Sequence, residues 1–127
     1  MYDTLTSKGE IVQFTDAANL LGNYPELNKR YAKRRSQLKL PKRVIFPDSS
    51  VAHETAGVHD WSITQIRLIS PEHQFYSTLM YMYDNKTTYV TLTKEVLLAV
   101  IIENEHITNM HRTLFEYMWT QAKPLEH

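Results

Sequence analysis

The chain has 127 residues, of which 43% are hydrophobic and 22% charged, a composition typical of one globular domain with a substantial core. Its 14 basic and 14 acidic side chains cancel, which argues against a histone-like nucleic-acid binder and against an acidic tail protein. The absence of cysteine excludes disulfides, thiolate metal sites and cysteine nucleophiles, and only 3 glycines leave little room for a glycine-rich phosphate loop.

The N-terminal third of the sequence predicts a strand followed by two helices. Its apolar pattern indicates a short strand over residues 10–14. Asp16 is placed to cap the following helix, and Gly22 is placed to end it. A second helix is expected to begin at Pro25, whose ring is tolerated in a first helical turn, and to end before Pro41.

The second helix combines an apolar stripe with a concentration of positive charge. Leu27, Tyr31 and Leu38 recur near helical spacing and predict the face that packs on the sheet. Eight of the 14 basic residues, and no acidic residue, lie in residues 29–43. This charge predicts either a solvated helix face or a contact with nucleic-acid phosphates. The candidate contacts on the other faces of this helix are Lys29, Arg30, Lys33, Arg34 and Arg35.

The middle of the sequence predicts further strands around a short helix. The apolar run over residues 43–46 predicts a buried strand, because it continues without alternation and stops at a turn-forming segment. Ser49 or Ser50 in that segment is placed to cap a short helix. Another strand is expected over residues 66–69, where it is closed by a proline.

The C-terminal third predicts a hairpin, a strand and a closing helix. Alternation around the turn-forming pair Asp84-Asn85 predicts a hairpin over residues 76–92. A buried strand is expected over residues 97–102, and a helix over residues 106–122. The apolar stripe of that helix, which we expect to face the core or a dimer partner, comprises Ile107, Met110, His111, Leu114, Phe115, Met118, Trp119 and Gln121.

This order of elements predicts an α/β fold in which a mixed β-sheet is flanked by helices. We expect one domain over residues 1–124, followed by an expression-tag remnant at Leu125-Glu126-His127. The first 20 residues contain no long apolar run, so no signal peptide is predicted. The longest apolar run, over residues 96–102, is too short to span a membrane, and we expect a cytoplasmic protein.

Side chains that could act as metal ligands or nucleophiles lack the spacing that such chemistry needs. The pairs His53/His59 and His106/His111 are six and five residues apart, which matches neither an i, i+4 pair nor His-Glu-x-x-His. Ser49 and Ser50 follow a strand but lack the Gly-x-Ser-x-Gly elbow of a serine hydrolase. We therefore predict no metal, no cofactor and no catalytic residue.

Several segments together resemble the C-terminal region of TrmB-like transcriptional regulators. Each segment alone is weakly specific, but they follow one another in order over nearly the whole chain. The matching segments are residues 9–16 (GEIVQFTD), 31–35 (YAKRR), 43–48 (RVIFPD), 84–86 (DNK), 98–104 (LAVIIEN) and 111–119 (HRTLFEYMW).

The resemblance implies a non-catalytic regulatory domain that acts in effector sensing, in dimerisation, or in both. It implies a homodimer, a possible small-molecule effector, and DNA binding through a separate N-terminal winged helix that this chain lacks. It also implies a fold similar to a phospholipase D half. In the His-x-Lys-x4-Asp pattern of that fold, Asp84 stands in place of the histidine and Thr91 in place of the aspartate. Lys86 alone supplies no nucleophile.

Within this interpretation, Asp48, Ser49 and Arg67 are the candidate ligand contacts, because they lie at or near strand ends. Two alternatives remain open at this stage. One is a degenerate phosphodiesterase-like hydrolase that depends on Lys86, and the other is a nucleic-acid contact through the basic helix.

Overall fold

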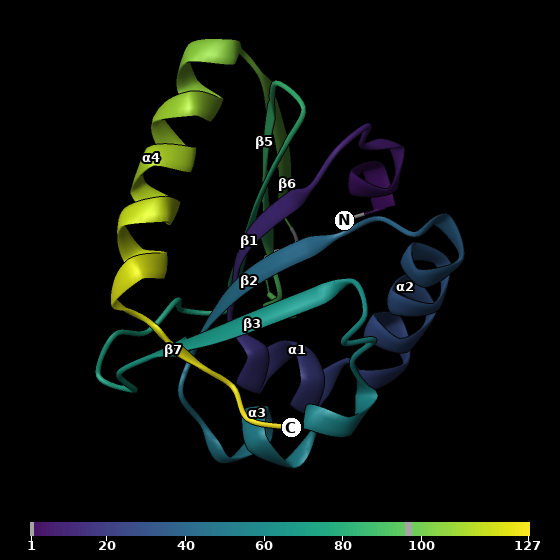
Figure 1. Cartoon of the computed structure of the whole chain (residues 1–127), viewed down its shortest axis with the longest axis vertical. Helices are drawn as coiled ribbons and strands as arrows, with labels where there is room; N and C mark the ends of the chain where they lie inside the picture. The colour runs from purple at the N-terminus through teal and green to yellow at the C-terminus, as the bar shows by residue number, and fades with distance from the viewer. Residues whose placement is uncertain (1, 96–97) are drawn as a thin grey trace.

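The computed structural model describes residues 2–95 and 98–127, which form one seven-stranded mixed sheet with helices against both faces (Figure 1). The predicted fold class, an α/β fold with a mixed sheet flanked by helices, is confirmed. Its finer likeness to a phospholipase D half stays a prediction. The elements in chain order are the 3-10 helix η1 (Tyr2–Thr6), β1 (Ile11–Thr15), α1 (Ala17–Asn23), α2 (Pro25–Leu38), β2 (Lys42–Pro47), α3 (Ser50–Glu54), the 3-10 helix η2 (Ala56–Val58), β3 (Thr64–Ile69), β4 (Thr78–Tyr83), β5 (Lys86–Thr91), β6 (Ala99–Glu103), α4 (Glu105–Gln121) and β7 (Lys123–Pro124).

The strand order across the sheet is β6-β5-β4-β1-β2-β3-β7. β2 pairs in parallel with β1 and with β3, whereas all other neighbouring strands pair antiparallel. The two helical crossovers of the N-terminal half therefore build the parallel centre β1-β2-β3. The β4–β5 hairpin and β6 extend the sheet beyond β1, and β7 extends it beyond β3.

Each face of the sheet has its own helical cover. α4 lies against one face, and α1, α2 and α3 lie against the other (Figure 1). Successive side chains of a strand point to opposite faces, and β1 shows the consequence. Ile11 packs in a cluster with Leu20 of α1, whereas Val12 and Phe14 pack in a cluster with Phe115 of α4.

Side-chain caps begin three of the helices. Asp16, Ser49 and Asn104 each accept a hydrogen bond from the backbone N–H three residues later, at 3.3, 3.1 and 3.0 Å. The predicted caps at Asp16 and Ser49 are confirmed. The predicted stop at Gly22 is wrong, because Gly22 lies inside α1, which ends one residue later without a left-handed glycine.

The predicted exposure of two α2 side chains is wrong. Arg35 is only 2% exposed, since its guanidinium donates to the Leu40 carbonyl at 2.8 Å and to the Thr64 hydroxyl at 2.5 Å. Leu38, expected on the buried stripe, is 40% exposed at the last turn. α2 ends there because Lys39 adopts a left-handed conformation, with φ of 55°, two residues before Pro41.

The strand expected to be buried near residue 100 is an exposed edge strand. Val96, where the apolar run begins, and Leu97, where the strand is predicted to begin, lie outside the described residues. β6 pairs only with β5, and Leu98 and Ile101 are each 50% exposed. Ile101 lies opposite Thr88, on the face away from α4, whereas its neighbour Ile102 lies opposite Thr87. An unbroken apolar run therefore does not distinguish a central strand from an edge strand here.

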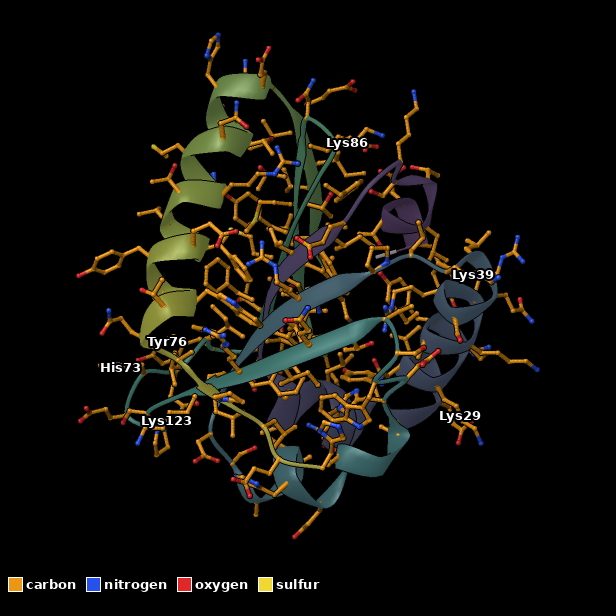
Figure 2. The ribbon with its side chains drawn as sticks, in the orientation of Figure 1. Lys29, Lys39, His73, Tyr76, Lys86 and Lys123 are labelled. Atoms are coloured by element: carbon orange, nitrogen blue, oxygen red, sulfur yellow. The ribbon has the colours of Figure 1, made fainter. Side chains whose placement is uncertain are left out.

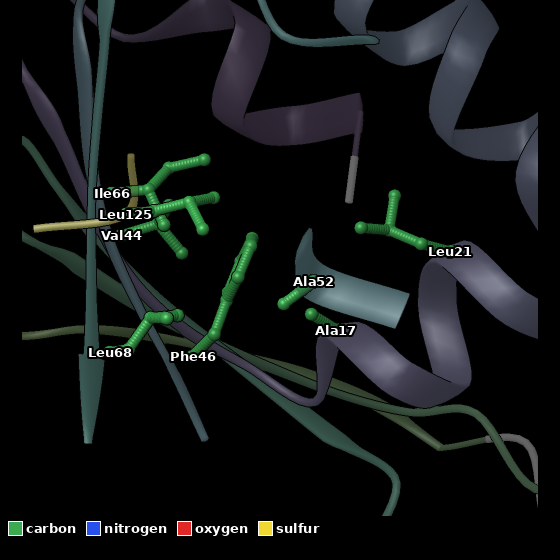
Figure 3. Close-up of a cluster of buried hydrophobic side chains, with 8 residues drawn as sticks. All are labelled: Ala17, Leu21, Val44, Phe46, Ala52, Ile66, Leu68 and Leu125. Atoms are coloured by element: carbon green, nitrogen blue, oxygen red, sulfur yellow. The ribbon is translucent and has the colours of Figure 1, made fainter. Parts of the chain in front are cut away.

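The C-terminal residues complete both the sheet and the core. β7 pairs with β3, and the Leu125 N–H donates to the Ile66 carbonyl at 3.0 Å. Leu125 is 3% exposed, so this residue of the predicted tag remnant packs as a core side chain. The tag origin itself stays a prediction. The cluster around it comprises Ala17, Leu21, Val44, Phe46, Ala52, Ile66, Leu68 and Leu125 (Figure 3).

We expect Leu125→Ala to lower the free energy of unfolding by about 3 kcal/mol, because it leaves a cavity among well-packed side chains. Glu126→Ala, one residue away and exposed, is the matched control and should change stability by less than about 0.5 kcal/mol. Urea unfolding of both variants provides the measurement. Equal stability of the two variants would contradict the packing described for Leu125.

Candidate functional site

The described residues form an open groove of about 1340 Å³. It lies between the segment that joins β3 to β4 and the C-terminal half of α4, and it reaches the β2–α3 turn. Its floor includes Phe14 of β1 and Met80 of β4, while Leu114 and Met118 of α4 form one wall. A concave, mainly apolar surface with few polar groups is the usual form of a small-molecule site.

One end of the groove is polar. Asp48 and His53 line it there, and an Asp48 carboxylate oxygen lies 2.7 Å from His53 Nε2. Lys123 of β7 lines the groove as well, and Figure 2 shows it near His73, at the C-terminal end of α4. A ligand with an apolar body and a polar end would match this division.

The structure brings only one of the three predicted ligand contacts into the groove. Asp48 lines it, as described above. Ser49 uses its hydroxyl to cap α3. Arg67 lies on the sheet beneath α4, where its guanidinium donates to the Trp119 carbonyl at 2.8 Å. That the three residues contact a ligand stays a prediction.

The wall opposite α4 is held in a strained backbone conformation. Tyr76 and Ser77 have φ of 50° and 60°, in the left-handed region that costs free energy for residues other than glycine. The predicted strand start at residue 76 is therefore wrong, and β4 begins at Thr78. Tyr76 is 83% exposed at the lip of the groove. The sequence carries no signal for this strain, since neither residue is glycine, asparagine or aspartate.

Hydrogen bonds from α1 and its cap stabilise this strained segment. An Asp16 carboxylate oxygen accepts from the Ser77 N–H at 2.7 Å, and the Asn19 amide donates to the Ser77 hydroxyl at 2.6 Å. The Ser77 carbonyl accepts from the Leu92 N–H at 2.7 Å. Asp16 thus serves both as a helix cap and as a support for the lip of the groove.

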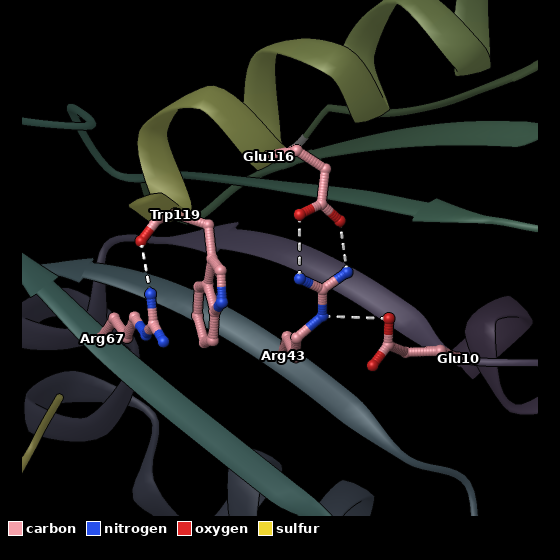
Figure 4. Close-up of polar contacts among 5 residues, drawn as sticks. All are labelled: Glu10, Arg43, Arg67, Glu116 and Trp119. Atoms are coloured by element: carbon pink, nitrogen blue, oxygen red, sulfur yellow. Dashed lines mark hydrogen bonds and ion pairs between the residues drawn. The ribbon is translucent and has the colours of Figure 1, made fainter. Parts of the chain in front are cut away.

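The α4 wall is fixed to the sheet by two arginines. Figure 4 shows the Trp119 indole between their guanidinium groups, whose carbons lie 4.4 Å (Arg67) and 5.3 Å (Arg43) from the ring centroid. Arg43 also forms ion pairs with Glu116 of α4 and with Glu10. The hydrogen bond between Arg43 and Glu116 raises the pKa of the arginine and lowers that of the carboxyl. Charge and ring contacts therefore act together to hold α4 in place.

The predicted apolar stripe of α4 is divided between core and solvent. Phe115 and Trp119 are buried, as expected for core positions. The core alternative is wrong for Ile107, Met110 and Leu114, which are 37%, 57% and 55% exposed, and the dimer alternative stays a prediction. The exposed apolar positions of α4 are Ile107, Met110, Leu114 and Tyr117. In the described residues, no helix has both the length and the apolar character that crossing a bilayer requires.

Lys86 and His111, which were also considered for chemistry, have structural partners. Lys86 forms an ion pair with Asp3 at 3.3 Å, and its ammonium lies 5.9 Å from the ring centroid of Tyr83. His111 lies between the Ile107 carbonyl and the Tyr89 hydroxyl, each 2.8 Å away. Over residues 2–95 and 98–127, no three histidine, aspartate or glutamate side chains are grouped as metal ligands.

The predicted nucleic-acid residues separate into one buried and four exposed side chains. Arg35 is buried and bonded, as described above. Lys29, Arg30, Lys33 and Arg34 are exposed on α2, and no ion pair joins any of them to an acid within the described part of the chain. Lys29 points outward from the ribbon in Figure 2, on the side of the molecule away from α4.

No protein-family model matches the chain, and no curated protein matches it in sequence. Among solved structures, its fold is similar to that of TrmBL2, an archaeal chromatin protein whose structure shows a novel mode of DNA binding. The TM-score is 0.64 at 12% identity, and the match covers 95% of this chain and 47% of TrmBL2. The chain thus spans about half the length of TrmBL2, and at this identity the likeness shows the fold alone.

We expect Asp16→Ala to lower the free energy of unfolding by about 2 kcal/mol, because it removes a helix cap and the bond to Ser77 together. Ser49→Ala is the matched control, since it removes a cap alone and should cost about 1 kcal/mol. Amide hydrogen exchange at Ser77 should accelerate in the first variant and stay unchanged in the second. Unchanged exchange in both variants would show that Asp16 does not support the lip.

Proposed function

We propose that this chain is the non-catalytic regulatory domain of a TrmB-like transcriptional regulator, and that its groove binds a small-molecule effector. The observation that carries the proposal is the groove itself, an apolar hollow with one polar end and one strained wall. The fold likeness to half of TrmBL2 supports the kind of protein, and the sequence resemblance supports the same family.

Effector binding would act through α4. Leu114 and Met118 of this helix line the groove, while Trp119 on the same helix sits between the two arginines of the sheet. A ligand that contacts the groove side of α4 more favourably in one arrangement of the helix than in another would shift the population between them. A shift of α4 on ligand binding would then also move the exposed apolar seam of the same helix.

Asp48 is the strongest candidate for the polar ligand contact, because its carboxylate lies in the groove beside His53. Ser49 and Arg67 stay in the proposal as residues that would have to exchange their present partners for a ligand. For Arg67 the exchange would release the Trp119 carbonyl, and it would thereby couple the ligand to α4.

Dimerisation is proposed through the exposed apolar seam of α4, which overlaps the groove wall at Leu114 and Tyr117. Ile107, Met110, Leu114 and Tyr117 are exposed and follow one another at intervals of three, four and three residues. This is the spacing of the apolar seam along which two helices pack. A second copy of the chain would cover the seam, and each copy would position a separate winged-helix domain on DNA.

A second candidate function is a direct nucleic-acid contact through α2. The observation that favours it is the group of four exposed cations, Lys29, Arg30, Lys33 and Arg34, which lack acidic partners among the described residues. Cations at successive turns of a helix can follow a phosphate backbone. The hydrolase alternative has no such support, since Lys86 is paired with Asp3.

Leu114→Arg should abolish binding of effectors found in a thermal-shift screen, because it places a charged side chain in the groove wall. Met110→Arg is the matched control: the residue is 57% exposed on the same seam but does not line the groove. Both variants should weaken a dimer in sedimentation, yet only the first should lose the ligand. Equal ligand affinity in the two variants would place the effector elsewhere.

Reversing charge in Lys29→Glu/Lys33→Glu should abolish a low-salt gel shift with duplex DNA, if α2 contacts phosphates. The double variant Lys8→Glu/Lys94→Glu is the control, because it makes the same change in net charge at exposed lysines outside α2. Binding by the wild type should fall steeply between about 50 and 200 mM salt. Absence of a shift at low salt in the wild type excludes this second function.

A further inference from the structure

A second, enclosed cavity lies on the opposite face of the sheet, beneath α1 and α2. Its volume is about 20 Å³, enough for one particle the size of a water molecule or a monoatomic ion. It shares no lining residue with the groove. Its polar walls come from Gln13 of β1, Arg35 of α2, Lys42 of β2, and His59 with Asp60 in the segment before β3.

Three side chains at this cavity carry buried polar atoms without a hydrogen-bond partner among the described residues. These atoms are Gln13 Oε1, Arg35 Nε and His59 Nε2. Gln13 and Arg35 are each only 2% exposed. An unpaired polar atom at such depth destabilises the folded state, so a particle that bonded to all three would be strongly favoured.

The rest of each side chain is already anchored. The Gln13 amide bonds to the Thr15 hydroxyl, and the terminal nitrogens of Arg35 donate to the Leu40 carbonyl and the Thr64 hydroxyl. The His59 ring packs 5.5 Å from the Trp61 ring, centroid to centroid. The unpaired atoms therefore cannot easily turn to other partners, and the site is preorganised.

The cavity carries an excess of positive charge. Arg35 lines it as a buried cation. Lys42 lines it too, and burial together with Arg35 lowers the pKa of its ammonium to about 7. Burial, Lys42 and Arg35 lower the pKa of His59 to about 4. The acid in the lining, Asp60, accepts from the hydroxyls of Ser36 and Ser62 and keeps its negative charge, which offsets one of the two basic side chains.

All three side chains can present an N–H donor to the cavity. Exchanging the oxygen and nitrogen of the Gln13 amide lets the Thr15 hydroxyl donate to the oxygen, and it turns the NH₂ group into the cavity. The neutral His59 ring can carry its proton on Nε2, and Arg35 Nε–H donates in every case. Three N–H donors around one small cavity, with Lys42 among its lining residues, are groups that would bind an anion.

We propose that this cavity binds one small monoatomic anion of the halide class, with chloride as the physiological ligand. The anion would accept hydrogen bonds from Gln13, Arg35 and His59, and it would offset the repulsion between Arg35 and Lys42. It would also join α2 to β1 and β2, whose side chains line the cavity. The site is independent of the effector proposed for the groove.

A bound water molecule is the competing occupant. Water could accept from Arg35 Nε–H and donate to Gln13 Oε1 and His59 Nε2, which would satisfy all three atoms. It would leave Asp60 as the acid in the lining that offsets Arg35 and Lys42. The excess of positive charge therefore favours the anion, and dependence on anion identity separates the two occupants.

Thermal unfolding of the full chain in chloride, bromide or gluconate, at one fixed ionic strength, tests the proposal. Chloride and bromide should raise the melting temperature in a saturable way, whereas gluconate is too large for the cavity and should have no effect. The ³⁵Cl NMR line of a chloride solution should broaden on adding protein, and bromide should narrow it again by competition. Identical melting curves in all three salts, without line broadening, would overturn the proposal in favour of water.

Lys42→Met tests the role of charge, because methionine keeps much of the apolar stem but removes the ammonium. We expect at least a tenfold weaker chloride dependence in this variant. Lys33→Met, at an exposed position of α2, is the control and should keep the wild-type dependence. Unchanged chloride dependence in Lys42→Met would overturn the proposal. If that variant does not fold, line broadening by the wild-type protein decides between anion and water.

Discussion

The contact of Trp119 with Arg43 and Arg67 is the interaction on which the functional arrangement depends. Cations above aromatic rings contribute about 0.5–2 kcal/mol each, and here two of them flank one indole at the end of α4. The contact fixes α4 across the strands, and α4 in turn supplies one wall of the groove. It also leaves the apolar seam of α4 exposed. The position of α4 therefore determines both proposed surfaces, the effector groove and the dimerisation seam.

The two faces of the sheet are packed by different kinds of side chain. On the α4 face, aromatic rings and the bidentate ion pair between Arg43 and Glu116 hold the helix on the sheet. Beside this contact the groove stays open, with Tyr76 at its lip. The other face buries Arg35 and draws Lys42 inward around a small polar cavity. Buried cations are costly unless they are compensated. The groove proposed for an effector is therefore open and mainly apolar, whereas the cavity proposed for an anion is small and has polar walls.

Local signals in the sequence predicted most of the fold but only part of the site. The hairpin around Asp84-Asn85 and the caps at Asp16 and Ser49 depend on neighbours within a few residues, and all three are confirmed. Asp48 was identified from its place after a strand, and it does line the groove. The strained Tyr76 could not be identified, because bonds from Asp16 and Asn19, about 60 residues away, hold the segment that contains it.

The sequence by itself determined the element types, the α/β class and the absence of thiol chemistry, since these follow from periodicity, capping and composition. Tertiary structure alone decided which apolar and charged residues face water. Leu114 and Phe115 are adjacent in one stripe, yet only Phe115 meets the sheet, and Arg35 is buried among basic neighbours that are exposed. Burial is decided by what lies opposite a side chain, and that partner comes from a distant part of the chain.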